Sequence, residues 1–407
     1  MPTLNAPSIP IYLDNAASTP ILDEVLRDML PYLKEHYGNP SSLHMFGRTT
    51  MRAIQKARRS VSSLIGCKEN EVIFTSGGTE ANNLAVKGIA ESVRLRNPEK
   101  DHIIASSIEH ESILEPFRYL EKNGFDVTYL PVTKRAEIEA RSLRKAMKPG
   151  RTAFASIMFC NNEVGTIQPI RELACIVHKD EGLFHCDAVQ AVGKIPIDVN
   201  YLGVDLLSMS SHKINGPKGV GALYARNGLK LPTFTHGGGQ EFALRSGTEN
   251  VAGIVGFGKA CELARKRLLI YQTEVLALRE YLVRRVLGEI PNCRLNGSTD
   301  NRIANNAHFT FFGIKGEDLI MKLDEMGVAA STGSACSSRH LRSSHVLKAM
   351  KFSHLELSGS LRLTVGTQNT KEEMDQVVSI LSKVVDELRR VSPFELAVPQ
   401  SEASKPL

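Results

Sequence analysis

The sequence predicts an α/β protein whose large domain contains a mainly parallel seven-stranded sheet, followed by a smaller α+β domain. Three observations predict this fold. Short apolar runs rich in β-branched residues alternate with amphipathic helical segments from about residue 70 to residue 265. The alternation ends near residue 266, where a longer helical pattern begins. The 407 residues are enough for two domains with separate cores.

Seven apolar runs are the predicted strands of the large sheet: Glu71–Thr75, His102–Ser106, Val127–Pro131, Ala153–Phe159, Leu183–Asp187, Leu206–Ser210 and Gly221–Ala225. Helical patterns lie between some of them, at Glu80–Val93, Ile113–Asn123 and Ile170–Lys179. In a sheet of this kind, ligands bind outside the carboxyl ends of the strands. Residues that directly follow a strand are therefore the first candidates for a functional site.

The smaller domain is predicted from helical patterns and strands at Lys266–Leu287, Ala307–Phe312, Lys315–Met326, Ser360–Val365 and Thr370–Val391. We expect the chain to divide into four parts. They are an N-terminal segment that packs with the small domain (1–19), a large cofactor-binding domain (20–265), the small domain (266–391) and a flexible tail rich in Pro, Ser and Ala (392–407).

The composition is typical of a globular protein outside the membrane, with 42% hydrophobic and 23% charged residues. No apolar run reaches the length of a membrane span, and the N-terminus lacks the pattern of a signal peptide, so we expect a cytoplasmic protein with no membrane partner. The net charge of +6 is mild. The basic cluster Lys56–Arg59 has no interleaved aromatic residues, so a solvated helix face is favoured over direct nucleic-acid binding.

The first candidate site lies in Ser76-Gly77-Gly78-Thr79, between a predicted strand and a predicted helix. Glycines let the backbone approach a ligand, and the free N–H groups at a helix start attract an anion. The segment therefore predicts a phosphate site at Gly78 and Thr79. It is equally suited to an ordinary loop in which Thr79 caps the helix and nothing binds.

The second candidate is Asp187, which ends a predicted strand, with Gln190 close behind it. Pyridoxal phosphate (PLP) needs an acid beside its ring nitrogen, because a protonated ring is the better electron sink. Asp187 suits that role, and Gln190 can reach the ring's phenolate oxygen. Taken alone, Asp187 is equally suited to capping a helix.

The third candidate is Lys213, which follows the strand Leu206–Ser210 and precedes a Gly-Pro turn. A lysine is rarely drawn inward unless it is paired, and a desolvated lysine amine with a lowered pKa attacks carbonyls. We predict that Lys213 holds PLP as a Schiff base and that Ser210 and His212 bind its phosphate. The competing Lys218 follows the turn and is expected to face solvent.

Further residues complete the predicted pocket. His110 and Asn162 each follow a predicted strand, and they are placed to stack over the ring and to contact the ring oxygen or the substrate. A metal site at His110 is disfavoured, because no partners stand at ligand spacing. The seven cysteines form no CxxC pair, which argues against a disulfide framework or a zinc site. Cys336 stands among small polar residues, in a predicted loop where solvent can reach its thiol.

With these residues in hand, the chain resembles the cysteine desulfurases of the nitrogen-fixation and iron–sulfur-assembly type, which are class V aminotransferase relatives with the PLP-dependent fold-type I architecture. The resemblance runs from Tyr12 to about Leu388. The motifs that carry it are Gly38-Asn39-Pro40-Ser41-Ser42, Ser76-Gly77-Gly78-Thr79-Glu80, Asn161-Asn162-Glu163-Val164-Gly165, Ser211-His212-Lys213, Arg245-Ser246-Gly247-Thr248 and Gly333-Ser334-Ala335-Cys336.

The resemblance implies a role for each matching position. The phosphate contacts would be Gly78, Thr79, Ser210 and His212, the ring contacts Asp187, Gln190 and Asn162, and the Schiff-base lysine Lys213. His110 would be the stacking acid–base, Arg362 the clamp on the substrate carboxylate (with Asn162 also at the substrate), and Cys336 the nucleophile that takes the sulfur of L-cysteine. Thr248 would reach the phosphate of the neighbouring subunit, which implies a homodimer with composite sites.

Three points stay open from the sequence. A selenocysteine lyase or another class V enzyme keeps the same fold with a different substrate, and a non-catalytic sulfur carrier or scaffold is a remote alternative. The sulfur acceptor is not identified; an iron–sulfur scaffold is one candidate, and Cys336 is a possible ligand of a shared cluster. Arg342-Ser343 stand where the family often has an acidic residue and a proline, which makes this loop more basic.

Overall fold

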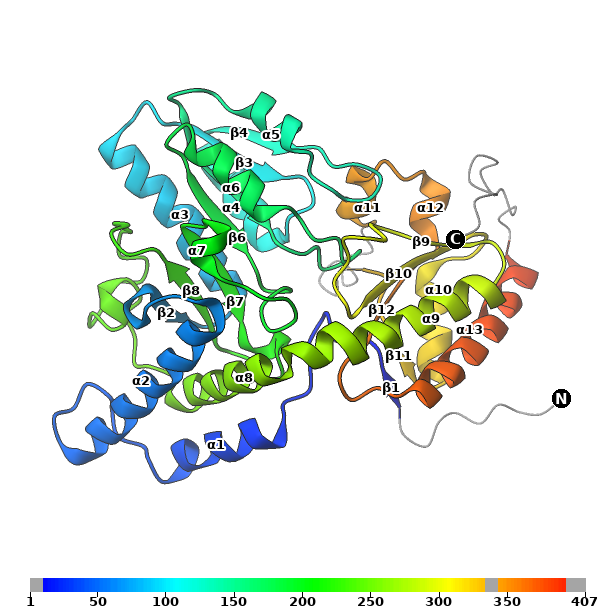
Figure 1. The fold of residues 1–407 in the computed structure, drawn as a ribbon, viewed down its shortest axis with the longest axis horizontal. Coiled ribbons are helices and arrows are strands. Elements are labelled where there is room, and N and C mark those ends of the chain that lie inside the picture. The colour runs from blue at the N-terminus through cyan, green and yellow to red at the C-terminus, as the bar shows by residue number, and fades with distance from the viewer. Residues whose placement is uncertain (1–9, 334–342, 393–407) are drawn as a thin grey trace.

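The computed structural model describes residues 10–333 and 343–392. Its largest sheet has seven strands in the order β2-β8-β7-β6-β5-β3-β4 (Figure 1). The strands are β2 Val72–Thr75, β3 His102–Ser106, β4 Asp126–Leu130, β5 Thr152–Met158, β6 Leu183–Asp187, β7 Leu206–Ser210 and β8 Gly221–Ala225. All neighbours pair in parallel except β8, which is antiparallel to both β2 and β7. The predicted mainly parallel seven-stranded sheet is confirmed.

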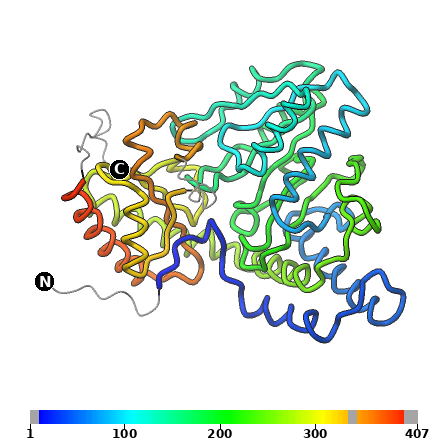
Figure 2. The backbone as a smooth tube through the Cα atoms, turned by 180° about the vertical axis from the view of Figure 1, so that it is seen from behind, coloured from blue at the N-terminus to red at the C-terminus, as the bar shows by residue number. Residues whose placement is uncertain are grey.

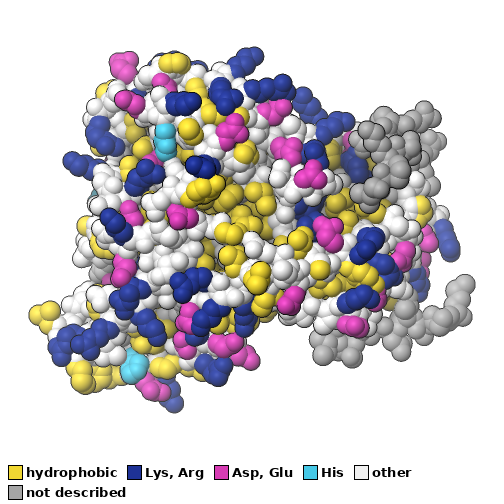
Figure 3. Space-filling view, viewed as in Figure 1, with side chains coloured by type: hydrophobic (Ala, Val, Ile, Leu, Met, Phe, Trp, Pro, Cys, Tyr) yellow, Lys and Arg dark blue, Asp and Glu magenta, His cyan; other side chains and the backbone are white. Residues whose placement is uncertain are grey.

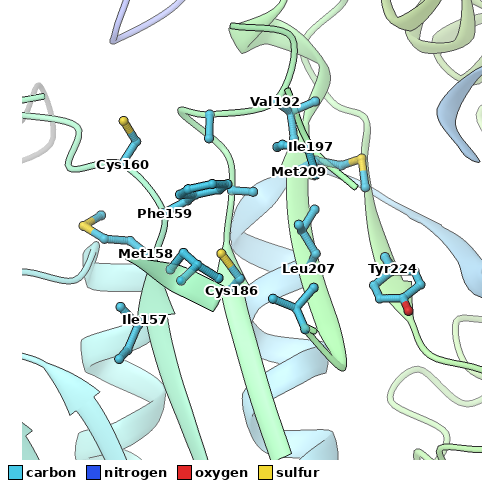
Figure 4. Packing of buried hydrophobic residues seen from close by; sticks show 14 of the residues in the cluster. Ile157, Met158, Phe159, Cys160, Cys186, Val192, Ile197, Leu207, Met209 and Tyr224 are labelled. Atoms are coloured by element: carbon cyan, nitrogen blue, oxygen red, sulfur yellow. The ribbon is translucent and has the colours of Figure 1, made fainter. Parts of the chain in front are cut away.

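Helices cover both faces of this sheet: α2 Met45–Ile65, α3 Gly78–Arg96, α4 Glu111–Lys122, α5 Ala140–Ala146, α6 Ile170–His178, α7 Val199–Leu202 and α8 Val251–Ile270. α1 Asp23–Lys34 packs against α8 instead. Successive strand residues alternate between two apolar layers, because side chains alternate across a strand. Ile73 packs in a layer with residues of α3 and α4, whereas Phe74 packs in a layer with residues of α2, α6 and α8. Figure 4 shows part of the second layer.

A second, smaller body of structure follows along the chain. Its three-stranded antiparallel sheet has the order β12-β10-β9, and β1 pairs in parallel with β11 beside it. The elements are β1 Ile11–Tyr12, α9 Leu276–Glu289, β9 Cys293–Leu295, β10 Asn306–Phe311, α10 Gly316–Glu325, β11 Val328–Ala329, α11 His345–Ala349, α12 His354–Ser358, β12 Ser360–Thr364 and α13 Lys371–Val391. Its core contains Leu13 from the N-terminal segment, together with Phe309 and Leu363. The predicted α+β character is present here.

One long helical stretch joins the two bodies. α8 continues through a π-helical turn at Tyr271–Val275 into α9, so helix begins fifteen residues before the predicted start at Lys266. The helical pattern in the sequence is weak before Lys266 because this part of α8 contains glycines. Gly258 lies against α2, where a Cβ would be 2.5 Å from the Cα of Ala57. The division of the chain near residue 265 stays a prediction.

The N-terminal segment after β1 runs between the two bodies, and then α1 and α2 form an arm that projects from the larger one (Figures 1 and 2). In the described ranges, no helix combines the length and the apolar character that crossing a membrane requires.

Candidate active site

A cavity of about 240 Å³ lies at the carboxyl ends of the parallel strands. Ten of the residues predicted from the sequence line it: Gly78, Thr79, His110, Asn162, Asp187, Gln190, Ser210, His212, Lys213 and Arg362. Two others are not found there. Thr248 is exposed and lies away from the cavity of its own chain, and Cys336 lies outside the described residues.

The phosphate segment has the predicted strand–turn–helix form. β2 ends at Thr75, and α3 begins at Gly78 after Gly77, whose φ of 153° is a conformation that favours glycine. A Cβ on Gly78 would stand 2.8 Å from Val189 Cγ2, so only glycine leaves this edge of the cavity open. The free N–H groups at the start of α3 meet the anion-binding requirement.

His212 lies beside these groups, and its Nδ1 is 3.2 Å from the Ser18 hydroxyl. Burial lowers the pKa of His212 to about 4, and the charge of Lys213 adds to this effect. The ring is therefore neutral near pH 7, and it offers one hydrogen-bond donor and one acceptor.

Asp187 ends β6 and is held by two donors. Its Oδ1 accepts from the backbone N–H of Val189 at 3.0 Å, and its Oδ2 accepts from Asn82 Nδ2 at 2.7 Å. The carboxyl group is only slightly exposed and lines the cavity. A fixed acid of this kind suits the nitrogen of a pyridine ring.

Lys213 lies in the 3₁₀ turn Ser211–Lys213, directly after β7. Its Nζ donates to the backbone oxygens of Ala16 and Ala17, at 2.5 and 2.8 Å. Lys218 is exposed, as predicted. The amine of Lys213 therefore lies inside the cavity, held by two carbonyls that no sequence motif had identified.

Sequence reasoning also missed Lys194, a lysine that is only 1% exposed. Its Nζ donates to Gln190 Oε1 at 3.3 Å, while Gln190 Nε2 donates to the Ala16 oxygen at 2.9 Å. Burial lowers the pKa of Lys194 to about 8. Lys194 thus holds the side chain of Gln190 from four residues further along the same turn.

Arg362 lies on β12 and is 1% exposed. Its Nη2 pairs with Asp14 Oδ1 at 2.7 Å, and its Nη1 donates to the backbone oxygen of Asn162 at 2.9 Å. Its Nε is buried and has no hydrogen-bond partner in the described part of the chain. A buried arginine with an unused donor beside a cavity suits an anionic ligand such as a carboxylate.

The segment that carries Cys336 enters and leaves the described structure beside this cavity. Ser331 pairs with Arg362 as an isolated bridge. Glu163 Oε2 accepts from the Ser344 hydroxyl at 2.5 Å, and it lies 2.8 Å from where a Cβ on Gly333 would be. Gly333 and Ser344 therefore both lie close to the same oxygen of one buried carboxylate.

The side chains of the cavity fit PLP. The N-terminus of α3 with Ser210 and His212 offers donors for a phosphate, Asp187 offers an acid for a ring nitrogen, and Lys213 offers an amine for an aldehyde. The unused Arg362 donor suits the carboxylate of an amino-acid substrate. The lining also includes residues that had not been predicted, among them Asn82, Ser112, Met158 and Cys160.

Comparisons with known proteins agree with this geometry. The family described as Aminotransferase class-V matches residues 11–377. The protein named cysteine desulfurase IscS from Dictyoglomus turgidum is 48% identical over 385 residues, which cover 95% of this chain and 97% of that protein. A solved structure named NifS-like protein has a TM-score of 0.87 at 37% identity and covers 93% of this chain and 100% of its own. A structure named SspA in complex with cysteine has a TM-score of 0.77 at 36% identity, covering 87% of this chain and 98% of its own.

The family match and the 48% identity both extend over nearly the whole chain. The predicted fold class, the PLP cofactor and the enzyme class are confirmed. The chain belongs to the class V aminotransferase family and, within it, to the PLP-dependent cysteine desulfurases.

Proposed function

We propose that this cysteine desulfurase takes sulfur from L-cysteine with Lys213, His110 and Cys336 as its catalytic residues. The Cys336 thiolate attacks the substrate sulfur, the carbon–sulfur bond breaks, and its electron pair stays on carbon. Protonation of that carbon gives L-alanine, and Cys336 keeps the sulfur as a persulfide. Atoms balance: cysteine and one thiol become alanine and one persulfide.

The observation that carries the proposal is that one cavity joins Lys213, Asp187 and Arg362. Bound PLP supplies an electron sink for charge that develops on the substrate. Arg362 binds and orients the substrate carboxylate through its free donor, with Asn162 beside it. The Lys213 amine is placed to move the proton of the substrate Cα, and Asp187 holds a proton at the ring nitrogen.

The role of Cys336 rests on its place in the sequence. It follows Gly333 by three residues, and Gly333 and Ser344 lie beside Glu163, next to the cavity lined by Asn162. Cys336 itself lies outside the described residues, so the motif Gly333-Ser334-Ala335-Cys336 carries this assignment.

The test is alanine production from L-cysteine by the wild type, by Cys336→Ala, and by Cys175→Ala as a control on an exposed cysteine of α6. We expect Cys336→Ala to lose nearly all alanine production and to carry no added sulfur by mass spectrometry. Cys175→Ala should match the wild type. Wild-type alanine production by Cys336→Ala would remove Cys336 from the mechanism.

We infer that the protein is a homodimer with composite sites. The arm of α1, α2 and their connection exposes large apolar side chains, including Leu33, Tyr37, Leu43 and Phe46, and hydrophobic side chains gather at its tip (Figure 3). Exposed apolar clusters of this kind mark protein interfaces. An exposed Thr248, away from its own cavity, is consistent with a role at the site of the second subunit.

The dimer is tested by light scattering, which should give twice the mass of one chain. Leu33→Lys and Leu43→Lys should shift the protein toward monomer, and Thr248→Ala should weaken PLP binding without changing the mass. We propose a cytoplasmic location, where reducing conditions keep thiols available, and a sulfur-acceptor protein such as an iron–sulfur scaffold as the partner. Mapping the protein that takes the persulfide from Cys336 checks the partner.

A further inference from the structure

His110 directly precedes α4 and caps it with its own side chain. Its Nδ1 accepts from the backbone N–H of Ser112 at 3.1 Å and lies 2.8 Å from the Ser112 hydroxyl oxygen. A backbone N–H can only donate, so Nδ1 must carry a lone pair rather than a proton. The proton of the neutral ring is then on Nε2.

The direction of the Ser112 hydroxyl follows from Asn82. Asn82 Nδ2 has two hydrogens, and it donates to the Ser112 oxygen at 2.8 Å and to Asp187 Oδ2 at 2.7 Å. Because the Ser112 oxygen receives one of these hydrogens, its own hydrogen is free to point at His110 Nδ1. As a second donor to Nδ1, the Ser112 hydroxyl strengthens the preference for an unprotonated Nδ1 that the backbone N–H already sets.

The orientation of the Asn82 amide is fixed by the carboxylate. Rotating the amide would bring Asn82 Oδ1 against Asp187 Oδ2, which places two acceptors in contact. In the present orientation Oδ1 is buried and has no partner among the described residues. A buried unsatisfied oxygen costs free energy, so the bond to Asp187 outweighs that cost.

We propose that Asn82 and Ser112 are positioning residues that link Asp187 to His110 and hold His110 as the Nε2–H tautomer. His110 then faces the cavity as a hydrogen-bond donor instead of a base. This inference deepens the proposed function and rests on it. It also assigns the removal of the Cα proton to Lys213 alone, because His110 has no free lone pair to receive it.

The charges around His110 agree with a neutral ring. Burial lowers the pKa of His110; Asp187 on β6 and Glu111 on α4 act against this, whereas Lys213 after β7 and His345 on α11 add to it. The start of α4 disfavours a cation there, and hydrogen bonds to the lone pair of Nδ1 disfavour protonation. In the described part of the chain Nε2 makes no hydrogen bond, and His110 lines the cavity.

The experiment is side-chain nitrogen NMR of the holoenzyme labelled with ¹⁵N-histidine, with the His110 signals assigned from their loss in His110→Gln. We expect protonated Nε2 and unprotonated Nδ1 at neutral pH. Ser112→Ala removes one donor to Nδ1, so the pKa of His110 should rise by roughly 0.5–1, a threefold to tenfold change in its protonation constant. Ser112→Thr, which keeps the hydroxyl, should restore the wild-type value.

Ser92→Ala is the matched control, because Ser92 is also a buried serine, and its hydroxyl bonds the Lys230 oxygen and Arg96 Nη2 away from the cavity. It should leave the pKa of His110 unchanged. Asn82→Ala is a second test variant, because it removes the donor that orients the Ser112 hydroxyl. It should move the pKa of His110 in the same direction as Ser112→Ala. A proton on Nδ1 in the wild type, or an unchanged pKa in both variants, would overturn the proposal.

The NMR result does not depend on turnover, so the two proposals fail separately. Nε2–H on His110 together with no alanine from L-cysteine would reject the proposed function alone. Alanine production together with a proton on His110 Nδ1 would reject only the proposal that Asn82 and Ser112 hold His110 as the Nε2–H tautomer.

Discussion

The two walls of the cavity are built in different ways. His110, Asp187 and Lys213 form what we call the sheet wall, and each lies at or just after the carboxyl end of a strand of one sheet. Arg362 and the segment Asp14–Ala17 form the N-terminal wall, in which Asp14 pairs with an arginine 348 residues away along the chain. One sheet places the groups that are proposed to hold the cofactor, whereas contacts between distant segments place the arginine that is proposed to bind the substrate.

The walls also differ in their electrostatics. Behind the sheet wall, burial raises the pKa of Glu109 to about 8 and lowers the pKa of His110. In the N-terminal wall the charge of Arg362 is instead balanced by Asp14, which is partly exposed. We expect changes in the sheet wall to affect chemistry and pH dependence, and changes in the N-terminal wall to affect KM.

The largest effect is expected at Lys213 in the sheet wall. Lys213→Ala removes the amine that is proposed to hold the cofactor and to move the substrate proton, so alanine production should fall roughly 10³-fold. Borohydride reduction followed by peptide mapping should find PLP on Lys213 in the wild type and on no lysine in the variant. Lys218→Ala, at the exposed lysine, is the control and should keep the covalent cofactor. A tag on Lys218 in the wild type would contradict this assignment.

The second effect is on stability. Glu109 is protonated in the folded state below about pH 8 but ionises near its ordinary value when unfolded. The contribution of Glu109 to the free energy of unfolding is therefore complete at low pH. It is lost as the pH rises, by on the order of 1 kcal/mol per pH unit between about pH 5 and 8. Glu109→Gln should not show this loss, so its Tm relative to the wild type should rise with pH.

Thermal unfolding at several pH values measures this difference. Glu121→Gln on the exposed side of α4 is the matched control, and its Tm should follow the wild type at every pH. If the Tm of Glu109→Gln and the Tm of the wild type changed with pH in parallel, burial would not raise the pKa of Glu109.

The third effect is a change in KM, which we expect from the N-terminal wall and not from the sheet wall. Arg362→Lys loses the planar fork of donors, so kcat/KM for L-cysteine should fall about 10- to 100-fold, mainly through KM. The PLP absorbance should stay unchanged, since the sheet wall is intact. Arg279→Lys, at a buried arginine of α9 that donates to the Ala304 oxygen, should affect stability without raising KM. A lowered kcat at constant KM would place Arg362 outside substrate binding.

The smallest effect is expected at Thr364, which ties the N-terminal segment to β12. Its hydroxyl accepts from the Ala16 N–H at 2.9 Å and donates to the Leu13 oxygen at 3.2 Å. Thr364→Val should cost about 1–2 kcal/mol in unfolding free energy and raise KM slightly. Thr310→Val, in the same small sheet with two hydrogen bonds of its own, should cost as much without changing KM. Equal KM changes in both would show no special role for the N-terminal wall.

Much of the fold was readable from the sequence because its strands are short apolar runs that are buried. β3, β6, β7 and β8 match the predicted bounds, and the other strands of the large sheet differ by about one residue. The start of α8 was missed because close packing against α2 requires glycines, which weaken a helical pattern. β1 and β11 were missed because each has two residues and forms only by pairing with the other.

The sequence by itself indicated the residues of the sheet wall, since Asp187 ends a strand, His110 and Lys213 each follow one, and the strand pattern is local. Its motifs also indicated the family, and they predict that Cys336 is the nucleophile. Only the tertiary structure placed Asp14 against Arg362, and Asn82 between Ser112 and Asp187. These pairs depend on directional hydrogen bonds between segments far apart in the chain, and such contacts leave no periodic signal in a single sequence.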